Sequence, residues 1–148
     1  MDNLIVRECI YEDLDNIISL QHQWHNEEIT YGFIPADKNY LETRLGKYFL
    51  VAEVNNEIVG FCYGAIHSAD NMPVINNGQL YIEIEDIYIS LENRGTGIGS
   101  TLLNKILEVA KENGIERSLI YSSTKDLDNI IEFYKKHDYK TWYIQMCK

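Results

Sequence analysis

The 148-residue sequence has few of the features that mark linkers, membrane spans and disulfide-bonded domains. It has two prolines, no repeat and no stretch rich in proline, glycine and serine, so nothing divides it into domains. No apolar run approaches the ~20 residues of a transmembrane helix, and the acidic start "MDNLIVRECIYEDLD" does not resemble a signal peptide. The three cysteines have neither metal-binding nor redox spacing. We therefore expect one domain over residues 1–148, with reduced thiols in the cytoplasm.

Negative charge is in excess, with 23 acidic and 13 basic residues and a net charge of −10. Nucleic acids and anionic membranes require clustered Lys and Arg, so we expect neither as a partner. The excess is uneven, because residues 1–74 carry a net −8 and residues 75–148 a net −2. The first half is thus suited to a cation, while the second half tolerates an anion. The alternative is that the charge serves solubility alone.

Hydrophobic spacing and turn residues predict the order of the elements. Period-2 runs and apolar stretches predict strands at residues 3–9, 48–54, 57–66, 79–90, 117–123 and 139–148. Spacing of 3.6 residues predicts helices at 11–24, 38–48, 98–113 and 126–137. Asn55-Asn56 predicts a tight hairpin turn. Hairpins mixed with crossovers favour a mixed sheet flanked by helices over a fully parallel one.

The stretch "NRGTGIGS" (93–100) places three glycines at alternate positions between a predicted strand and a predicted helix. Unpaired amides at a helix start form an anion site, and glycine lets the backbone fold around a phosphate. Arg94 adds a positive charge. A dinucleotide-binding fingerprint does not fit, because Ser100 stands where its third small residue belongs. A P-loop does not fit either, because no Lys follows these glycines.

The pattern that fits is Arg-x-x-Gly-x-Gly, formed by Arg94, Gly97 and Gly99. Two further segments accompany it in order, the hairpin "VAEVNNEIVGF" and the helical "DNIIEFYKKHDY". With these three features the sequence resembles the GNAT superfamily of acyl-CoA-dependent N-acetyltransferases over residues 7–148. The resemblance implies a single α/β (α+β) domain with a central mixed, mostly antiparallel sheet of six to seven strands. About four helices would flank it, and a V-shaped splay would separate its two central parallel strands.

The resemblance also implies that acetyl-CoA binds as co-substrate in the splay, with no metal. Ile87, Tyr88 and Ile89 would pair with its pantetheine arm, and the amides from Arg94 to Ser100 would wrap its diphosphate. Asn129 would cap the last helix or bond the cofactor arm. The residues expected to bind the cofactor are Ile87, Tyr88, Ile89, Arg94, Gly95, Thr96, Gly97, Ile98, Gly99, Ser100, Asn129, Tyr134 and Lys136.

The chemistry would be attack of an amine on a thioester. A free alkylamine has a pKa near ~10.4 and must lose a proton first. Similar enzymes keep a carboxylate where Glu85 stands, so Glu85 is expected as the base, directly or through water. A β-bulge would change which face of the sheet these acids point to, so Asp86 remains an alternative as the base. The other alternative is that both are ordinary acids on a solvated strand face. Tyr134 matches the family's general acid, its alternative being a core aromatic.

The segment "QHQWHNEEITYGF" would form the acceptor wall, because aromatic faces with carboxylates suit an ammonium group. The residues expected to bind the acceptor are Trp24, Glu27, Glu28, Tyr31, Phe33 and Asp86. A loop that packs its aromatics on the core is the alternative. His22, His25 and Glu28 have helical spacing, but without a second ligand pair we expect a polar helix end and no metal.

We therefore expect an N-acetyltransferase that acts on a small cationic amine, such as a polyamine, an aminoglycoside or a related metabolite. Acetylation of a protein N-terminus or lysine is one alternative, and a non-catalytic acyl-CoA sensor is another. A homodimer is left open. One departure from the family pattern is His137-Asp138-Tyr139 in place of its Gly-Phe. It puts Asp138 at a helix end that glycine would occupy at lower conformational cost.

Overall fold

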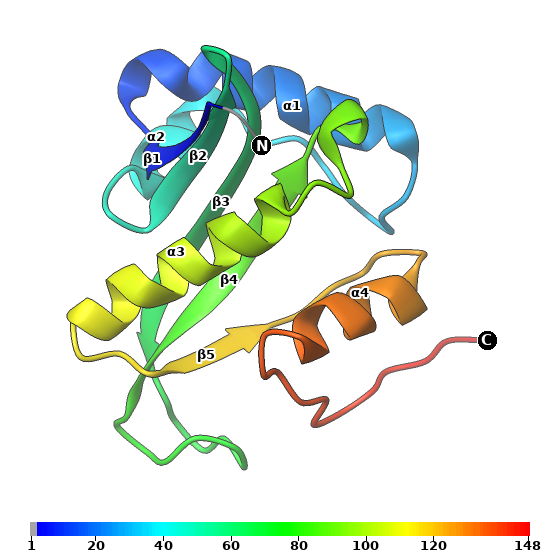
Figure 1. Ribbon diagram of the computed structural model, residues 1–148. Coiled ribbons are helices and arrows are strands. Elements are labelled where there is room, and N and C mark those ends of the chain that lie inside the picture. The colour runs from blue at the N-terminus through cyan, green and yellow to red at the C-terminus, as the bar shows by residue number, and fades with distance from the viewer. Residues whose placement is uncertain (1–2) are drawn as a thin grey trace.

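One mixed sheet forms the centre of the computed structural model, which describes residues 3–148 (Figure 1). Its strands lie in the order β1-β2-β3-β4-β5, and β4 and β5 are parallel while the other neighbours are antiparallel. The strands are β1 (Leu4–Glu8), β2 (Phe49–Val54), β3 (Glu57–Ser68), β4 (Leu80–Ile89) and β5 (Arg117–Ile120). The predicted α+β class is confirmed.

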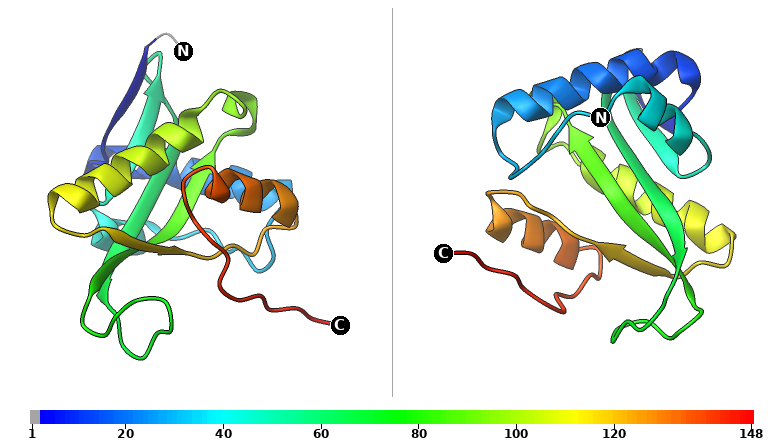
Figure 2. Two further views of the ribbon diagram at one scale, coloured as in Figure 1. Left: turned by 60° about the horizontal axis from the view of Figure 1, so that its bottom comes forward. Right: turned by 180° about the vertical axis from the view of Figure 1, so that it is seen from behind.

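Helices cover both faces of this sheet, as the two views of Figure 2 show. They are α1 (Leu14–Glu27), α2 (Lys38–Arg44), α3 (Ile98–Glu112) and α4 (Leu127–Lys135). Short 3₁₀ turns at Tyr11–Asp13 and Leu91–Asn93 precede α1 and follow β4. None of the helices in residues 3–148 is both long and apolar enough to cross a membrane.

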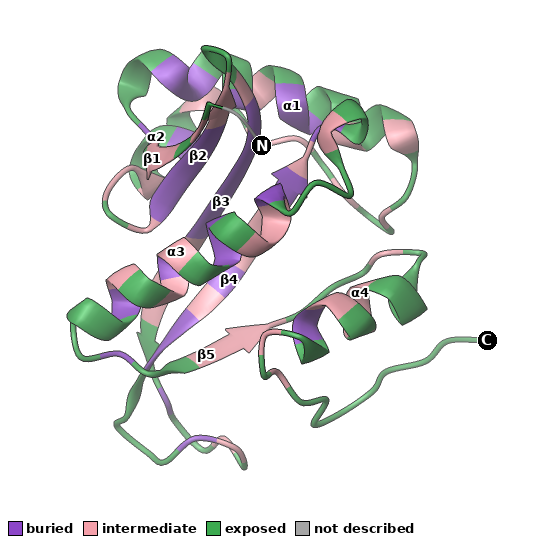
Figure 3. Cartoon of the chain, in the orientation of Figure 1, coloured by how far each residue is buried: buried purple, intermediate pink, exposed green. Residues whose placement is uncertain are grey.

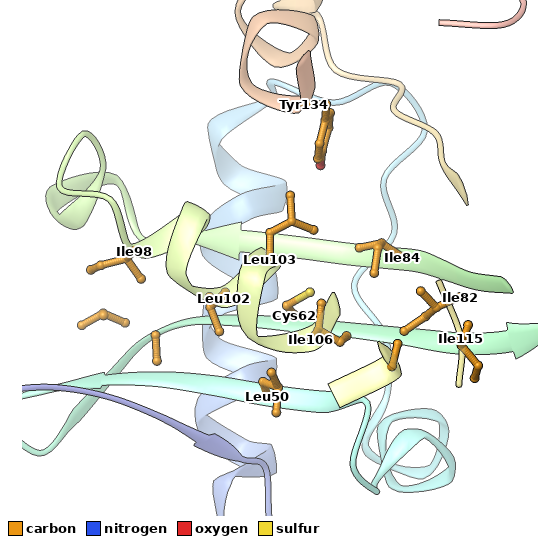
Figure 4. Close-up of a cluster of buried hydrophobic side chains, with 13 residues drawn as sticks. Leu50, Cys62, Ile82, Ile84, Ile98, Leu102, Leu103, Ile106, Ile115 and Tyr134 are labelled. Atoms are coloured by element: carbon orange, nitrogen blue, oxygen red, sulfur yellow. The ribbon is translucent and has the colours of Figure 1, made fainter. Parts of the chain in front are cut away.

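The core has two large apolar clusters on opposite faces of the sheet and a third, small one formed by Ala69, Ile75 and Tyr81. Figure 3 shows the buried residues along the strands and helices. Alternation along β2 sends Leu50 to the α3 face, and Phe49 and Val51 to the α1 face. The cluster under α3 and α4 includes Leu50, Cys62, Ile82, Ile84, Leu102, Leu103, Ile106 and Tyr134 (Figure 4). The cluster under α1 and α2 includes Leu14, Ile17, Leu41, Phe49, Phe61, Tyr63 and Tyr88.

The hairpin turn and the splay are both present. Asn55 and Asn56 adopt φ values of 51° and 66°, the positive values that a two-residue hairpin requires. β4 pairs with β5 only from Tyr81 to Ile84, although β4 continues to Ile89. The last five residues of β4 therefore have no β5 partner, which is the predicted V-shaped splay.

The predicted sixth and seventh strands are not found, so the described sheet has five strands. Residues 139–148 form no strand, and β5 ends at Ile120 instead of continuing to residue 123. Figure 1 shows this C-terminal segment running away from the sheet. Its Trp142 and Met146 are 44% and 84% exposed. An apolar, aromatic run predicts a strand from its composition alone. Such a run forms a strand only when neighbouring strands are available to pack against, and its own residues do not show whether they are.

Asp138, three residues beyond the last residue of α4, adopts φ 66°, the conformation that makes glycine the easier residue at this helix end. Its amide donates to the Lys135 carbonyl at 3.1 Å, and the Tyr139 amide donates to the Tyr134 carbonyl at 3.1 Å. A left-handed residue thus closes the helix, although its side chain makes this conformation costly.

We expect Asp138→Gly to raise the free energy of unfolding by about 0.5–1 kcal/mol, because glycine adopts this conformation without strain. Urea denaturation measures the change. Asp128→Gly, in the first turn of the same helix, should lower the free energy of unfolding by about 1 kcal/mol. Equal effects of the two substitutions would contradict the assignment of strain to Asp138.

Candidate functional site

The open edge of β4 presents backbone groups toward the splay. The Ser90 amide donates to the carbonyl of Val59 on the neighbouring strand β3 at 2.8 Å, and antiparallel pairing alternates from there. Ile87 and Ile89 therefore turn their backbone groups to the open edge, while those of Tyr88 face β3. This corrects the expectation that the Tyr88 backbone would pair with a ligand in the splay.

The glycine stretch forms a cradle at the start of α3. Gly95 and Gly97 adopt φ values of 73° and 86°, which side chains strongly disfavour. Gly97 caps the helix without a side-chain acceptor, and the first helical bond runs from the Thr101 amide to the Gly97 carbonyl. The amides of residues 98–100 therefore have no hydrogen-bond partner within the helix, and such amides are suited to bind an anion.

Gly99 differs from Gly95 and Gly97, because it lies inside α3 and has no positive φ. A Cβ built on Gly99 would lie 3.6 Å from the ring of Phe133 on α4. The α4 end is also joined to α3 by His137, whose ring nitrogens lie 3.0 Å from Ser100 Oγ and 3.0 Å from Asn104 Oδ1. Sequence patterns did not indicate this role of His137, since its partners lie on another helix.

Arg94 is tied to α1 and to β4. Its terminal nitrogens donate to both carboxylate oxygens of Glu27 at 2.7 and 2.6 Å, and its Nε donates to the Ile89 carbonyl at 2.9 Å. The Tyr88 hydroxyl donates to the same carboxylate at 2.5 Å. Burial acts to raise the pKa of Glu27, but the hydrogen bonds from Arg94 and Tyr88 hold that pKa below its ordinary value. Glu27, predicted on the acceptor wall, is thus the partner of Arg94.

A β-bulge at Glu85 decides how the acids of β4 face. Asp86 lies opposite Tyr63 and Ile84 opposite Gly64, which leaves Glu85 as the extra residue. Both Glu85 and Asp86 therefore point to the α1/α2 face of the sheet.

Each of these two carboxylates has its own partner. Glu85 accepts from Arg44 Nε of α2 at 2.9 Å and forms an ion pair with that guanidinium. Asp86 accepts from the Tyr63 hydroxyl. Burial raises the pKa of Asp86 to about 6, against the lowering effects of the Tyr63 hydrogen bond and the Arg44 charge. Burial also raises the pKa of Tyr63, so this phenol stays protonated and donates. Neither Arg44 nor Tyr63 carried a sequence signal, because both act through tertiary contact.

Tyr134 projects from α4 toward β4 and the side chain of Leu103 (Figure 4). The residue is 9% exposed and packs against Phe133 and Tyr139. Burial raises the pKa of its hydroxyl. In residues 3–148 the one fully enclosed polar side-chain atom without a hydrogen bond is Gln21 Nε2. The Tyr134 hydroxyl, which has no protein partner in this range, therefore keeps access to open space.

The predicted acceptor wall is an aromatic stack at the end of α1. The Trp24 ring lies 4.1 Å from that of Phe33 and 5.2 Å from that of Tyr88, and its Nε1 donates to Thr30 at 2.9 Å. The exposed Tyr31 lies apart from this stack with Lys125 over its ring. An open depression of about 440 Å³ is lined by Trp24, His25, Glu28, Thr30, Gly32, Phe33 and Lys125.

The other predicted residues lie on the surface. Asn129 donates to the Asp126 carboxylate at 2.7 Å at the start of α4, and Lys136 is exposed at its end. Thr96 donates to the Asn93 carbonyl at 2.6 Å inside the glycine turn. No group of three His, Cys, Asp or Glu side chains within residues 3–148 is placed to hold a metal ion.

Comparison with known proteins finds similar sequences and similar folds. An N-acetyltransferase of Methanocaldococcus jannaschii, itself uncharacterised, is 33% identical over 88 residues, which cover 60% of this chain and 37% of that protein. A predicted acetyltransferase from Clostridium acetobutylicum, solved with acetyl-CoA, superposes with a TM-score of 0.72 at 20% identity over 97% of this chain and 96% of the other. A glucosamine-6-phosphate N-acetyltransferase from Arabidopsis thaliana superposes with a TM-score of 0.73 at 19% identity over 99% and 98%.

An aminoglycoside acetyltransferase from an uncultured soil sample superposes with a TM-score of 0.74 at 20% identity over 99% of this chain and 97% of the other. At such identities these superpositions establish the fold. The model of the acetyltransferase (GNAT) family matches residues 11–139, which include the hairpin, the splay, the glycine cradle and α4. The chain therefore belongs to the GNAT family of acetyltransferases.

Proposed function

We propose that this protein transfers the acetyl group of acetyl-CoA to a primary amine of a small cationic acceptor, within one domain and by direct attack in a ternary complex. The observation that carries the proposal is the unpaired edge of β4, which ends beside the glycine cradle of α3. An extended amide-bearing arm fits the edge, and a diphosphate fits the cradle.

The co-substrate would be held mainly by backbone. Ile87 and Ile89 would pair with the pantetheine arm, and the amides of Ile98, Gly99 and Ser100 would bind the diphosphate. Backbone donors matter here because a polyanion must approach a protein of net charge −10. Acetyl-CoA supplies an acetyl thioester, and the remaining chemistry is proton transfer by this chain.

Asp86 is the proton acceptor in this proposal, and Glu85 positions Arg44. A base works best when its pKa lies near the working pH, and burial brings that of Asp86 to about 6. Glu85 is instead neutralised by its ion pair with Arg44. The bulge supports this choice, since it turns Asp86 to the α1/α2 face beside Glu85.

Tyr134 is the proton donor to the departing sulfur. Its hydroxyl has no protein partner within the described range and projects toward β4 (Figure 4). The raised pKa keeps it protonated until a thiolate forms beside it. The Ile87 amide at the open edge would stabilise the negative charge that develops on the carbonyl oxygen.

The acceptor would bind on the α1/α2 face of β4, which carries Glu85 and Asp86 and, further along the strand, Tyr88 of the aromatic stack. Carboxylates with aromatic faces favour ammonium groups. Structurally similar proteins include an aminoglycoside acetyltransferase and a glucosamine-6-phosphate N-acetyltransferase, which supports a small-molecule acceptor.

The test is a thiol-release assay with acetyl-CoA against spermidine, aminoglycosides and N-terminal peptides, with CoA binding measured by calorimetry. We expect turnover with a cationic small amine. Turnover of peptides alone would favour the protein acetyltransferase, and CoA binding without any turnover would favour a sensor. Absence of CoA binding at millimolar concentration would refute the proposal.

A further inference from the structure

The Arg94–Glu27 pair joins two regions that the proposed function keeps separate. Arg94 opens the glycine stretch, and Glu27 is the last residue of α1, beside the aromatic stack. The pair is bidentate, and the side chains are 34% and 16% exposed. The Arg94 guanidinium also lies 5.2 Å from the centre of the Tyr88 ring, and Tyr88 itself stacks on Trp24.

Arg94 occupies two groups that the substrates would need. Its Nε donates a hydrogen bond to the Ile89 carbonyl, which faces the open edge of β4. Its terminal nitrogens neutralise the Glu27 carboxylate, which is the acid nearest the Tyr88 end of the aromatic stack. In this arrangement the same cation therefore covers part of the edge and cancels a negative charge on the acceptor side.

We propose that Glu27 and Arg94 form an exchangeable ion pair that couples the two substrate sites, a proposal that rests on the proposed function. A diphosphate in the glycine cradle offers Arg94 a doubly charged partner in place of a single carboxylate. When Arg94 turns to the diphosphate, the Ile89 carbonyl becomes free for the pantetheine arm. Glu27 becomes free at the same time, and it then binds an ammonium group of the acceptor.

This makes Glu27 a positioning and specificity residue. It gives up Arg94 when the co-substrate binds, and its released charge favours cationic over neutral amines. Coupling of this kind is reciprocal and typically amounts to about 5–150-fold in affinity. A purely structural salt bridge would have the opposite signature, because breaking it would disorder the turn at Arg94 and weaken CoA binding.

Calorimetric titration with CoA separates the two roles. In Glu27→Gln, Arg94 no longer has to leave an ion pair, so we expect CoA to bind about tenfold more tightly than to wild type. Glu28→Gln is the matched control, because it removes an equal charge one residue away and outside the ion pair. It should tighten CoA binding less than twofold at ~0.15 M salt, where screening is strong beyond ~8 Å. Unchanged or weaker CoA binding by Glu27→Gln would overturn the exchange.

Spermidine titrations with and without saturating CoA, which allows no turnover, test the acceptor half. We expect CoA to tighten spermidine binding about tenfold in wild type and in Glu28→Gln, but less than twofold in Glu27→Gln. Equal spermidine affinities with and without CoA in wild type, or no detectable spermidine binding in either state, would refute this half. If wild type does not bind CoA at all, the proposed function fails first.

Discussion

Tyr134→Phe is expected to lower the rate of acetyl transfer about 10²–10³-fold while the Kd for CoA changes less than twofold. Phenylalanine keeps the packing of the ring against Phe133 and Tyr139 and removes only the hydroxyl. Because that hydroxyl has no protein partner in residues 3–148, its loss strands no buried group. Stopped-flow thiol release and calorimetry measure the two quantities.

Tyr139→Phe is the control for this substitution. The Tyr139 hydroxyl lies 2.6 Å from Ser118 Oγ, so its loss should cost about 1 kcal/mol of stability and leave turnover unchanged. Wild-type rates in Tyr134→Phe would remove Tyr134 from the mechanism and leave it as a core aromatic.

Asp86→Asn is expected to lower kcat/KM for the acceptor by about 10²–10³-fold, because the amide cannot accept a proton from the ammonium group. Asparagine preserves the shape of the side chain and can still accept a hydrogen bond from Tyr63. Glu85→Gln should lower kcat/KM less than tenfold, since Glu85 acts through Arg44. If Glu85→Gln has the larger effect, the base is Glu85, as the sequence-based expectation had it.

The pH dependence provides a second measure of the same assignment. Asp86 accepts a proton only when ionised, and its pKa lies at about 6. The acceptor kcat/KM of wild type should therefore rise as pH increases through about 6, with the Asp86 contribution complete above it. Glu85→Gln should keep this rise of kcat/KM with pH, and Asp86→Asn should lose it. If the rise persists in Asp86→Asn, the titrating group is not Asp86.

Local sequence signals predicted most of the fold. Asn55-Asn56 marked the hairpin, and the period of 3.6 after Gly97 marked α3, because both depend on residues near one another in the chain. The conformational cost at Asp138 was predicted for the same reason, and its φ of 66° agrees with it. The strand expected at residues 139–148 is absent, because a strand needs a partner edge that its own residues do not specify.

The candidate site was predicted in outline, but its pairings were not. Arg94 and Glu27 are 67 positions apart, and Arg44 and Glu85 are 41 positions apart. Arg94 and Glu27 were expected to bind substrates and Glu85 to act as the base, and no role was predicted for Arg44, whereas the structure brings them together as ion pairs. The bulge at Glu85 had been recognised as an open alternative, and only the register of β3 on β4 resolved it.

By itself, the sequence determined the family, the class of fold and a glycine-lined helix start suited to an anion. These follow from periodicity, from the backbone freedom of glycine and from motifs that span a few residues. Only the tertiary structure decided which acids are neutralised, which backbone groups of β4 remain unpaired and where Tyr134 points. Those properties depend on distances between segments remote in the chain, and burial and pairing then set the charge each group carries.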